Sequence, residues 1–172
     1  MANGNESYKP HIISVTVENR AGVLARIVGL FSARGYNIDS LSVGETEDPT
    51  ISRMTIVAKG DDKILEQIYK QLNKLIDVIK VQDLTSEEFV SRELVLVKVH
   101  TPNGTARQEV MQLVSIFRTK IIDVGKKSLT IELVGSSPKV NAMIALLQNF
   151  GIREITKTGA IAMARESGKR SE

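Results

Sequence analysis

The chain has 172 residues, of which 42% are hydrophobic and 25% are charged, and its formal net charge is +3. This length suits one ordinary domain or two small ones with a real core. The absence of cysteine excludes disulfides, iron–sulfur clusters and cysteine nucleophiles, and it suits a reducing compartment.

Targeting and membrane segments are not visible in the sequence. Residues 1–10 are polar and lack the apolar segment of a signal peptide. The longest uncharged stretch, residues 140–152, is too short to cross a bilayer. We therefore expect a cytoplasmic protein without membrane contact.

The spacing of apolar residues in the first half alternates between strand and helix periods. A period of two predicts strands over residues 11–18, 36–44, 51–58 and 77–84. Helical spacing predicts a helix from Val23 to a turn at Gly35 and a second helix over residues 61–75. This order is the split βαβ pattern, which implies an antiparallel sheet with both helices on one face. The other face is expected to stay uncovered within the chain and to bind a partner.

The same order recurs after a polar linker. Strands are predicted over residues 94–101, 120–124, 128–134 and 152–158, and helices over residues 106–118 and 138–150. We therefore expect an α+β chain of two consecutive ferredoxin-like βαββαβ domains. Their expected limits are residues 11–84 and 94–165, with a linker over 85–93 and disordered ends at 1–10 and 166–172.

The loop between the first predicted strand and helix is the most informative stretch. A helix start exposes unpaired backbone amides that bind anions, and Gly22 would let a ligand approach the backbone closely. Asn19 offers both a donor and an acceptor, which suits a ligand with carboxylate and ammonium groups. A plain turn with an N-cap explains the same spacing. Asn37 either satisfies its own turn or faces this loop from a second copy paired edge to edge.

Catalytic motifs for nucleotide binding, zinc proteases and serine hydrolases are absent from the sequence. The two histidines, His11 and His100, lie at ends of predicted strands without a carboxylate at ligand spacing, and a surface or strand-edge position is expected for both. No catalytic residue and no metal site are therefore expected in this chain.

Long stretches of the sequence resemble one family, the regulatory small subunits of acetohydroxyacid synthase. They are ENRAGVLARIVGLFSARGYNIDSLSV (18–43), DPTISRMTIV (48–57), LEQIYKQLNKLIDVIKV (65–81), RELVLVKV (92–99) and IFRTKIIDV (116–124). The resemblance covers about residues 11–165 and implies that the first domain is an ACT domain.

The resemblance implies a non-catalytic subunit in branched-chain amino acid biosynthesis. Such subunits bind and activate a catalytic large subunit, which is expected to carry thiamine diphosphate, Mg and FAD, and they bind no cofactor themselves. They confer feedback inhibition by valine or another branched-chain amino acid at the interface of an ACT-domain homodimer. Carried over to this chain, the effector residues are Asn19, Gly22, Val23 and Leu24 of one copy and Asn37 and Ile38 of the other. The open sheet face is expected to contact the catalytic subunit.

Two alternatives belong to other functional classes. An acylphosphatase-like enzyme on the same scaffold would use Arg20 and Asn37 to hold a phosphate, although the surrounding loop does not match that family. An RNA-recognition sheet would need aromatic residues on its first and third strands, and the segments IISVTV and TISRMTIV contain none.

Overall fold

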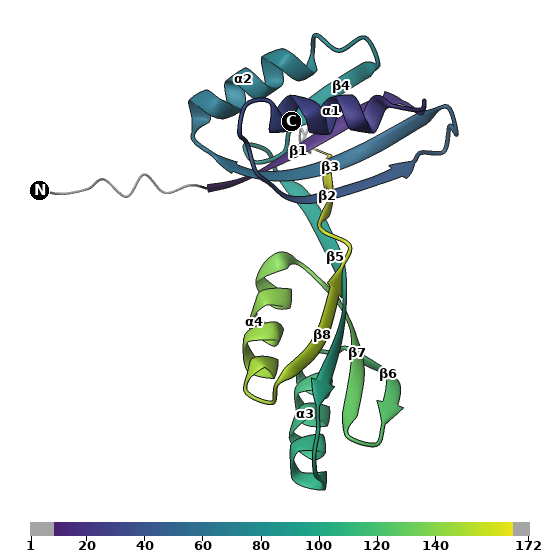
Figure 1. Ribbon diagram of the computed structural model, residues 1–172, viewed down its shortest axis with the longest axis vertical. Coiled ribbons are helices and arrows are strands. Elements are labelled where there is room, and N and C mark those ends of the chain that lie inside the picture. The colour runs from purple at the N-terminus through teal and green to yellow at the C-terminus, as the bar shows by residue number, and fades with distance from the viewer. Residues whose placement is uncertain (1–8, 167–172) are drawn as a thin grey trace, which may run out of the picture. The chain divides into compact units, whose positions relative to one another are not determined.

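The computed structural model describes residues 9–166, apart from the side chains of Lys9 and Asp62. Residues 1–8 and 167–172, most of the predicted disordered ends, lie outside this range. The chain divides into two compact units (Figure 1). Unit 1 comprises the described residues up to Val90 together with those from Ile161 onward, and unit 2 comprises Ser91–Ala160.

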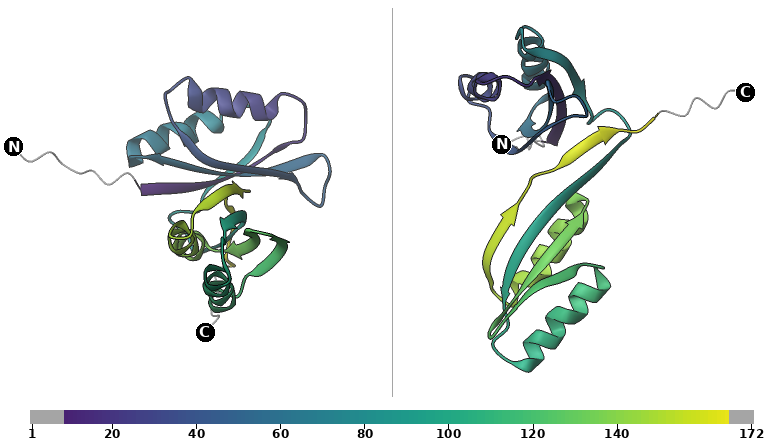
Figure 2. Two further views of the ribbon diagram at one scale, coloured as in Figure 1. Left: turned by 60° about the horizontal axis from the view of Figure 1, so that its bottom comes forward. Right: turned by 90° about the vertical axis from the view of Figure 1, so that its right-hand side faces the viewer.

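Unit 1 has the predicted βαββαβ order. Its elements are β1 (Lys9–Glu18), α1 (Val23–Ser32), β2 (Ile38–Glu45), β3 (Ile51–Gly60), α2 (Asp62–Leu72) and β4 (Val78–Asp83). The strands form an antiparallel sheet in the order β2-β3-β1-β4, so β2 and β4 are its edges. Both helices cover the same face of this sheet (Figures 1 and 2). The ferredoxin-like prediction is confirmed.

The core of unit 1 lies between the helices and the sheet. Ile27 and Phe31 of α1 are fully buried against Ile13 and Val15 of β1 and Ile56 of β3, in a single apolar cluster. Each such side chain contributes roughly 1.5–3 kcal/mol by leaving water. The alternation in the strands and the helical stripe in α1 therefore meet in one layer, as predicted.

The turn after α1 also follows the sequence signal. Gly35 has φ +70°, in the left-handed region that favours glycine. The amide of Tyr36 donates to the carbonyl of Phe31 at 3.0 Å, which closes the helix end as in a Schellman motif.

One strand of unit 1 was not predicted. β9 (Ile161–Ala164) contacts β1 and β3. The amide of Ala162 donates to Thr55 Oγ1 of β3 at 3.3 Å, and Thr55 is buried. The expectation that the outer face of this sheet stays uncovered was therefore wrong, because the chain's own β9 covers part of it.

Unit 2 repeats the order. Its elements are β5 (Phe89–His100), α3 (Gly104–Ile116), β6 (Lys120–Gly125), β7 (Ser128–Gly135), α4 (Ser137–Gln148) and β8 (Ile152–Lys157). The sheet order is β6-β7-β5-β8, antiparallel throughout. β5 begins at Phe89 rather than at 94, so the second part of the predicted linker is strand. Its buried face presents Val95, Val97 and Val99 to the helices.

Candidate functional site

The loop between β1 and α1 is fastened to the β2–β3 hairpin. The amide of Asn19 donates to the carbonyl of Thr50 at 2.7 Å. Its side-chain Nδ2 donates to Glu45 Oε1 at 3.0 Å and to the carbonyl of Pro49 at 2.9 Å. Asn19 thus holds the loop beside the end of β2.

The start of α1 is open. Gly22 occupies the N-cap position with φ +86°, and within the described residues no side chain caps the helix. The first turn also contains no acidic residue. The amide of Val23 donates to the carbonyl of Arg20 at 3.3 Å, but the next amides of a helix have no acceptor within the helix itself. Together with the helix dipole, this arrangement favours an anion.

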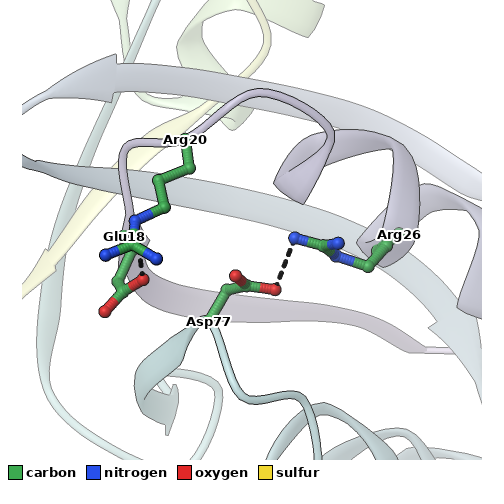
Figure 3. A network of polar contacts seen from close by, with 4 residues as sticks. All are labelled: Glu18, Arg20, Arg26 and Asp77. Atoms are coloured by element: carbon green, nitrogen blue, oxygen red, sulfur yellow. Dashed lines mark ion pairs between the residues drawn. The ribbon is translucent and has the colours of Figure 1, made fainter.

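Two ion pairs lie beside this helix start (Figure 3). Arg26 Nη2 of α1 lies 2.7 Å from Asp77 Oδ2, and the side chain of Asp77 is only 9% exposed. The carbonyl of Asp77 also accepts from the amide of Glu18 at 2.9 Å. Asp77 therefore ties the end of β1 to α1. In the second pair, Arg20 Nε lies 3.1 Å from Glu18 Oε2, and both side chains are more exposed than that of Asp77.

Asp77 and Glu45 were missed from the sequence. Their partners, Arg26 and Asn19, lie far away along the chain, and no local spacing marks such contacts. The acidic character of both residues was the only available signal.

The other predicted residues of the loop differ in what they expose. Val23 is buried in the core of unit 1, so a ligand could contact its backbone but not its side chain. Leu24 is 39% exposed and leaves an apolar surface at the helix start. Gly22 has open space around it, since a Cβ added there would meet nothing within 4 Å.

Asn37 and Ile38 lie at the opposite end of the same sheet. Ile38 pairs with Ala58 of β3, whereas the end of β1 pairs with Ile51 of β3. Seven residues of β3 separate these positions, which is about 23 Å at 3.3 Å per residue. Asn37 Nδ2 donates to Asp39 Oδ1 at 3.2 Å. One chain therefore does not bring the two parts of the predicted site together.

The same distance disfavours the acylphosphatase alternative. Arg20 lies in the loop after β1 and pairs with Glu18, whereas Asn37 precedes β2 at the far end of the sheet. The two groups do not converge on one phosphate within this chain.

Residues 9–166 offer neither a cluster of metal ligands nor a membrane-spanning helix. This part of the chain has no group of three or more His, Cys, Asp or Glu side chains placed to hold a metal ion. His11 is buried rather than exposed and hydrogen-bonds to the carbonyl of Gly60, while His100 lies near the carbonyl of Lys127. None of the described helices has the length and apolarity needed to span a membrane.

Comparison with known proteins places both halves of the chain. Residues 13–80 match the family model of the AHAS small subunit-like ACT domain, and residues 92–166 match the model of the small subunit of acetolactate synthase. Acetolactate synthase is another name for acetohydroxyacid synthase.

Individual relatives agree with these models. The chain is 55% identical over 157 residues to a probable acetolactate synthase small subunit of Methanothermobacter thermautotrophicus, covering 91% of this chain and 94% of that protein. It is 52% identical to the acetolactate synthase small subunit of Aquifex aeolicus, covering 95% and 85%. The crystal structure of the small subunit from Thermotoga maritima matches with a TM-score of 0.82 and 45% identity, covering 92% of this chain and 98% of that one. The chain therefore belongs to the family of acetolactate synthase small subunits.

Proposed function

We propose that this chain is a non-catalytic regulatory subunit that activates a catalytic acetohydroxyacid synthase subunit and makes it sensitive to a branched-chain amino acid. The effector, valine or a close relative, binds between the ACT domains of two copies. The catalytic subunit supplies thiamine diphosphate, Mg and FAD, and this chain supplies the effector site. The complex acts in the cytoplasm in branched-chain amino acid biosynthesis.

The observation that carries this proposal is the uncapped start of α1 beside exposed Leu24. The backbone amides there donate hydrogen bonds to the effector carboxylate, because they are unpaired and lie at the positive end of the helix dipole. Leu24 gives the aliphatic side chain an apolar surface. Small zwitterions with a branched apolar group match this combination.

The position of β2 supports a two-copy site. β2 is an edge strand, so it can pair with β2 of a second copy. A symmetric pair of this kind is antiparallel, so the Glu45 end of one β2 meets the Ile38 end of the other. The loop after β1 lies beside the Glu45 end, since Asn19 contacts Glu45. Asn37 and Ile38 of the second copy then face the loop of the first.

The energetics are adequate for a metabolite sensor. Binding near 100 μM requires about −5.5 kcal/mol. Hydrogen bonds to a charged carboxylate contribute about 1.5–3 kcal/mol each, and burial of an isopropyl group adds about 1.5–3 kcal/mol. An effector that bridges two copies favours one relative orientation of the pair. A coupling of about 1–3 kcal/mol then suffices to change the activity of the catalytic subunit.

Variants in the two halves of the site test the proposal. Gly22→Asp places negative charge where the effector carboxylate binds, and Asn37→His alters the group lent by the second copy. Homodimers of either variant should lose effector binding in isothermal titration and should still activate the catalytic subunit. If wild-type protein binds none of valine, leucine and isoleucine, the proposal is wrong.

A mixed dimer of the two variants, isolated with two affinity tags, makes the test sharper. Both changes then fall in one site, and the other site contains only wild-type residues. The mixed dimer should bind one effector molecule, half the wild-type stoichiometry. If the mixed dimer binds no effector although the wild type does, the two halves do not come from different copies.

A further inference from the structure

A zwitterionic effector brings an ammonium group as well as a carboxylate, and its positive charge needs an acceptor near the loop. The start of α1 cannot provide one, because its amides are donors and its dipole repels a cation. The acceptor must therefore come from side chains or carbonyls around the helix start.

Three carboxylates contact the loop or α1. Glu18 is paired with Arg20, and Asp77 is paired with Arg26, so the charge of each is already balanced. Glu45 differs from both. Among the described residues it has no cationic partner within 4 Å, and it accepts a hydrogen bond from the neutral amide of Asn19.

The hydrogen bonds of Asn19 also favour an ammonium group beside Glu45. Its Nδ2 group has two hydrogens, and these point to Glu45 Oε1 and to the carbonyl of Pro49. The remaining polar atom of this side chain, Oδ1, is only an acceptor. Asn19 is therefore not free to donate to a carboxylate without breaking these bonds, but it can receive an ammonium group together with Glu45.

We infer that Glu45 is the counter-ion for the effector's ammonium group, an inference that rests on the proposed effector site. Carboxylate and ammonium are then recognised by different parts of the chain: backbone amides at the start of α1 and side chains at the end of β2. Because Glu45 lies at the end of the edge strand, the bound ammonium also lies where the second copy approaches.

This assignment has a consequence for selectivity. A site with an unbalanced carboxylate prefers an amino acid to the same acid without its amino group. Isovalerate, which is valine without the ammonium group, should therefore bind the wild type more weakly than valine does.

Glu45→Gln removes the charge and keeps an amide oxygen that can accept from Asn19. Isothermal titration of wild type and variant, both as the full chain, with valine and isovalerate separates the two effects. We expect valine affinity to fall about threefold to fivefold in the variant, because the lost interaction is a partly screened charged hydrogen bond. Isovalerate affinity should not fall. Glu47→Gln, a matched change in the same hairpin, should leave both affinities unchanged.

Each other outcome counts against the inference in a recognisable way. If wild-type protein binds no branched-chain amino acid, the proposed function fails and this inference fails with it. If Glu45→Gln binds valine as the wild type does, the effector site stands and the role of Glu45 is wrong. If valine and isovalerate weaken equally, Glu45 shapes the loop and does not recognise the ammonium group.

Discussion

The two units of this chain share one fold and differ at the start of their first helix. In unit 1, α1 begins after Gly22, which has φ +86°, and no side chain caps this helix start. In unit 2, α3 begins after Asn103, whose side chain accepts from the amide of Ala106 at 2.9 Å. The same βαββαβ order therefore leaves one helix start open and satisfies the other from within the chain.

This difference shows that the fold alone does not specify a ligand site. A capped helix start gains local stability from its own side chain. An open start keeps its donors for another molecule, at the expense of that stability. Under the proposed function, the effector binds at the open helix start of unit 1 and the capped start in unit 2 is structural, and the following changes test that contrast.

Aspartate at the start of each helix should produce the largest difference. Gly22→Asp should lower effector affinity about a hundredfold or more, because charge repulsion adds to the loss of two or three hydrogen bonds. It should also cost about 1–2 kcal/mol of stability, since a side chain is strained at φ +86°. Gly104→Asp adds the same charge at the start of α3, where a Cβ likewise meets nothing within 4 Å. Effector titrations of both variants check this.

The control makes the result interpretable. Gly104→Asp should bind the effector as the wild type does. Equal losses in the two variants would mean that added charge anywhere in the chain weakens binding, and the contrast between the helix starts would then be wrong.

Removal of the cap in unit 2 should have a smaller effect, confined to stability. Asn103→Ala deletes the acceptor for the amide of Ala106 and should cost about 1 kcal/mol. Hydrogen exchange followed by mass spectrometry should show faster exchange at the start of α3 and no change at α1. Unchanged exchange at α3 would show that the cap does not stabilise this helix.

The helices and strands that form the layers of both units could be predicted from the sequence. The additional strand β9 could not. Side chains such as Ile27 and Phe31 are buried because helical spacing puts them on one face, and that spacing is readable locally. β9 has only four residues, too few for a periodic signal, and its contact with Thr55 joins residues that lie far apart in the sequence.

The candidate site divides in the same way. Asn19 and Gly22 could be predicted as candidates because they lie at a junction of strand and helix, where spacing is informative. Asp77 and Glu45 act through contacts with Arg26 and Asn19, which only the folded sheet brings close. Asn103 did carry a readable signal, because asparagine directly before a helical stripe is a favoured N-cap.

A smaller effect is expected from Asp77, which anchors α1 in place of a cap. Asp77→Asn keeps the shape of the side chain and removes its charge opposite Arg26. We expect a loss of about 0.5–1 kcal/mol, because Arg26 is half-exposed and water replaces part of the interaction. Urea unfolding measured by circular dichroism gives the size, and hydrogen exchange should place the change at α1. Glu18→Gln, which alters the exposed pair with Arg20, serves as the control and should change stability less.

The smallest effect concerns the two hairpins at acid pH. In the β2–β3 hairpin, Asp48 Oδ1 accepts from the amide and the hydroxyl of Thr50 at 2.8 and 2.7 Å. In the β6–β7 hairpin, Arg107 Nη2 donates to the carbonyls of Gly125 and Lys126 at 2.6 and 3.1 Å. One turn is therefore held by a group that protonates in acid, and the other by a guanidinium that stays charged.

The side-chain and backbone hydrogen bonds from Thr50 lower the pKa of Asp48 below its usual value. A carboxyl with a lowered pKa stabilises the folded state above its unfolded pKa of about 3.9, and this contribution is lost as the pH falls through the folded pKa. An NMR titration should therefore show the Thr50 amide shifting in acid together with the Asp48 carboxyl, while amides of residues 125–127 stay constant. Asp48→Ala should abolish the shift at Thr50. A titration of Asp48 at or above its usual pKa would show that this turn is not held by the carboxylate, and the two hairpins would then not differ in acid.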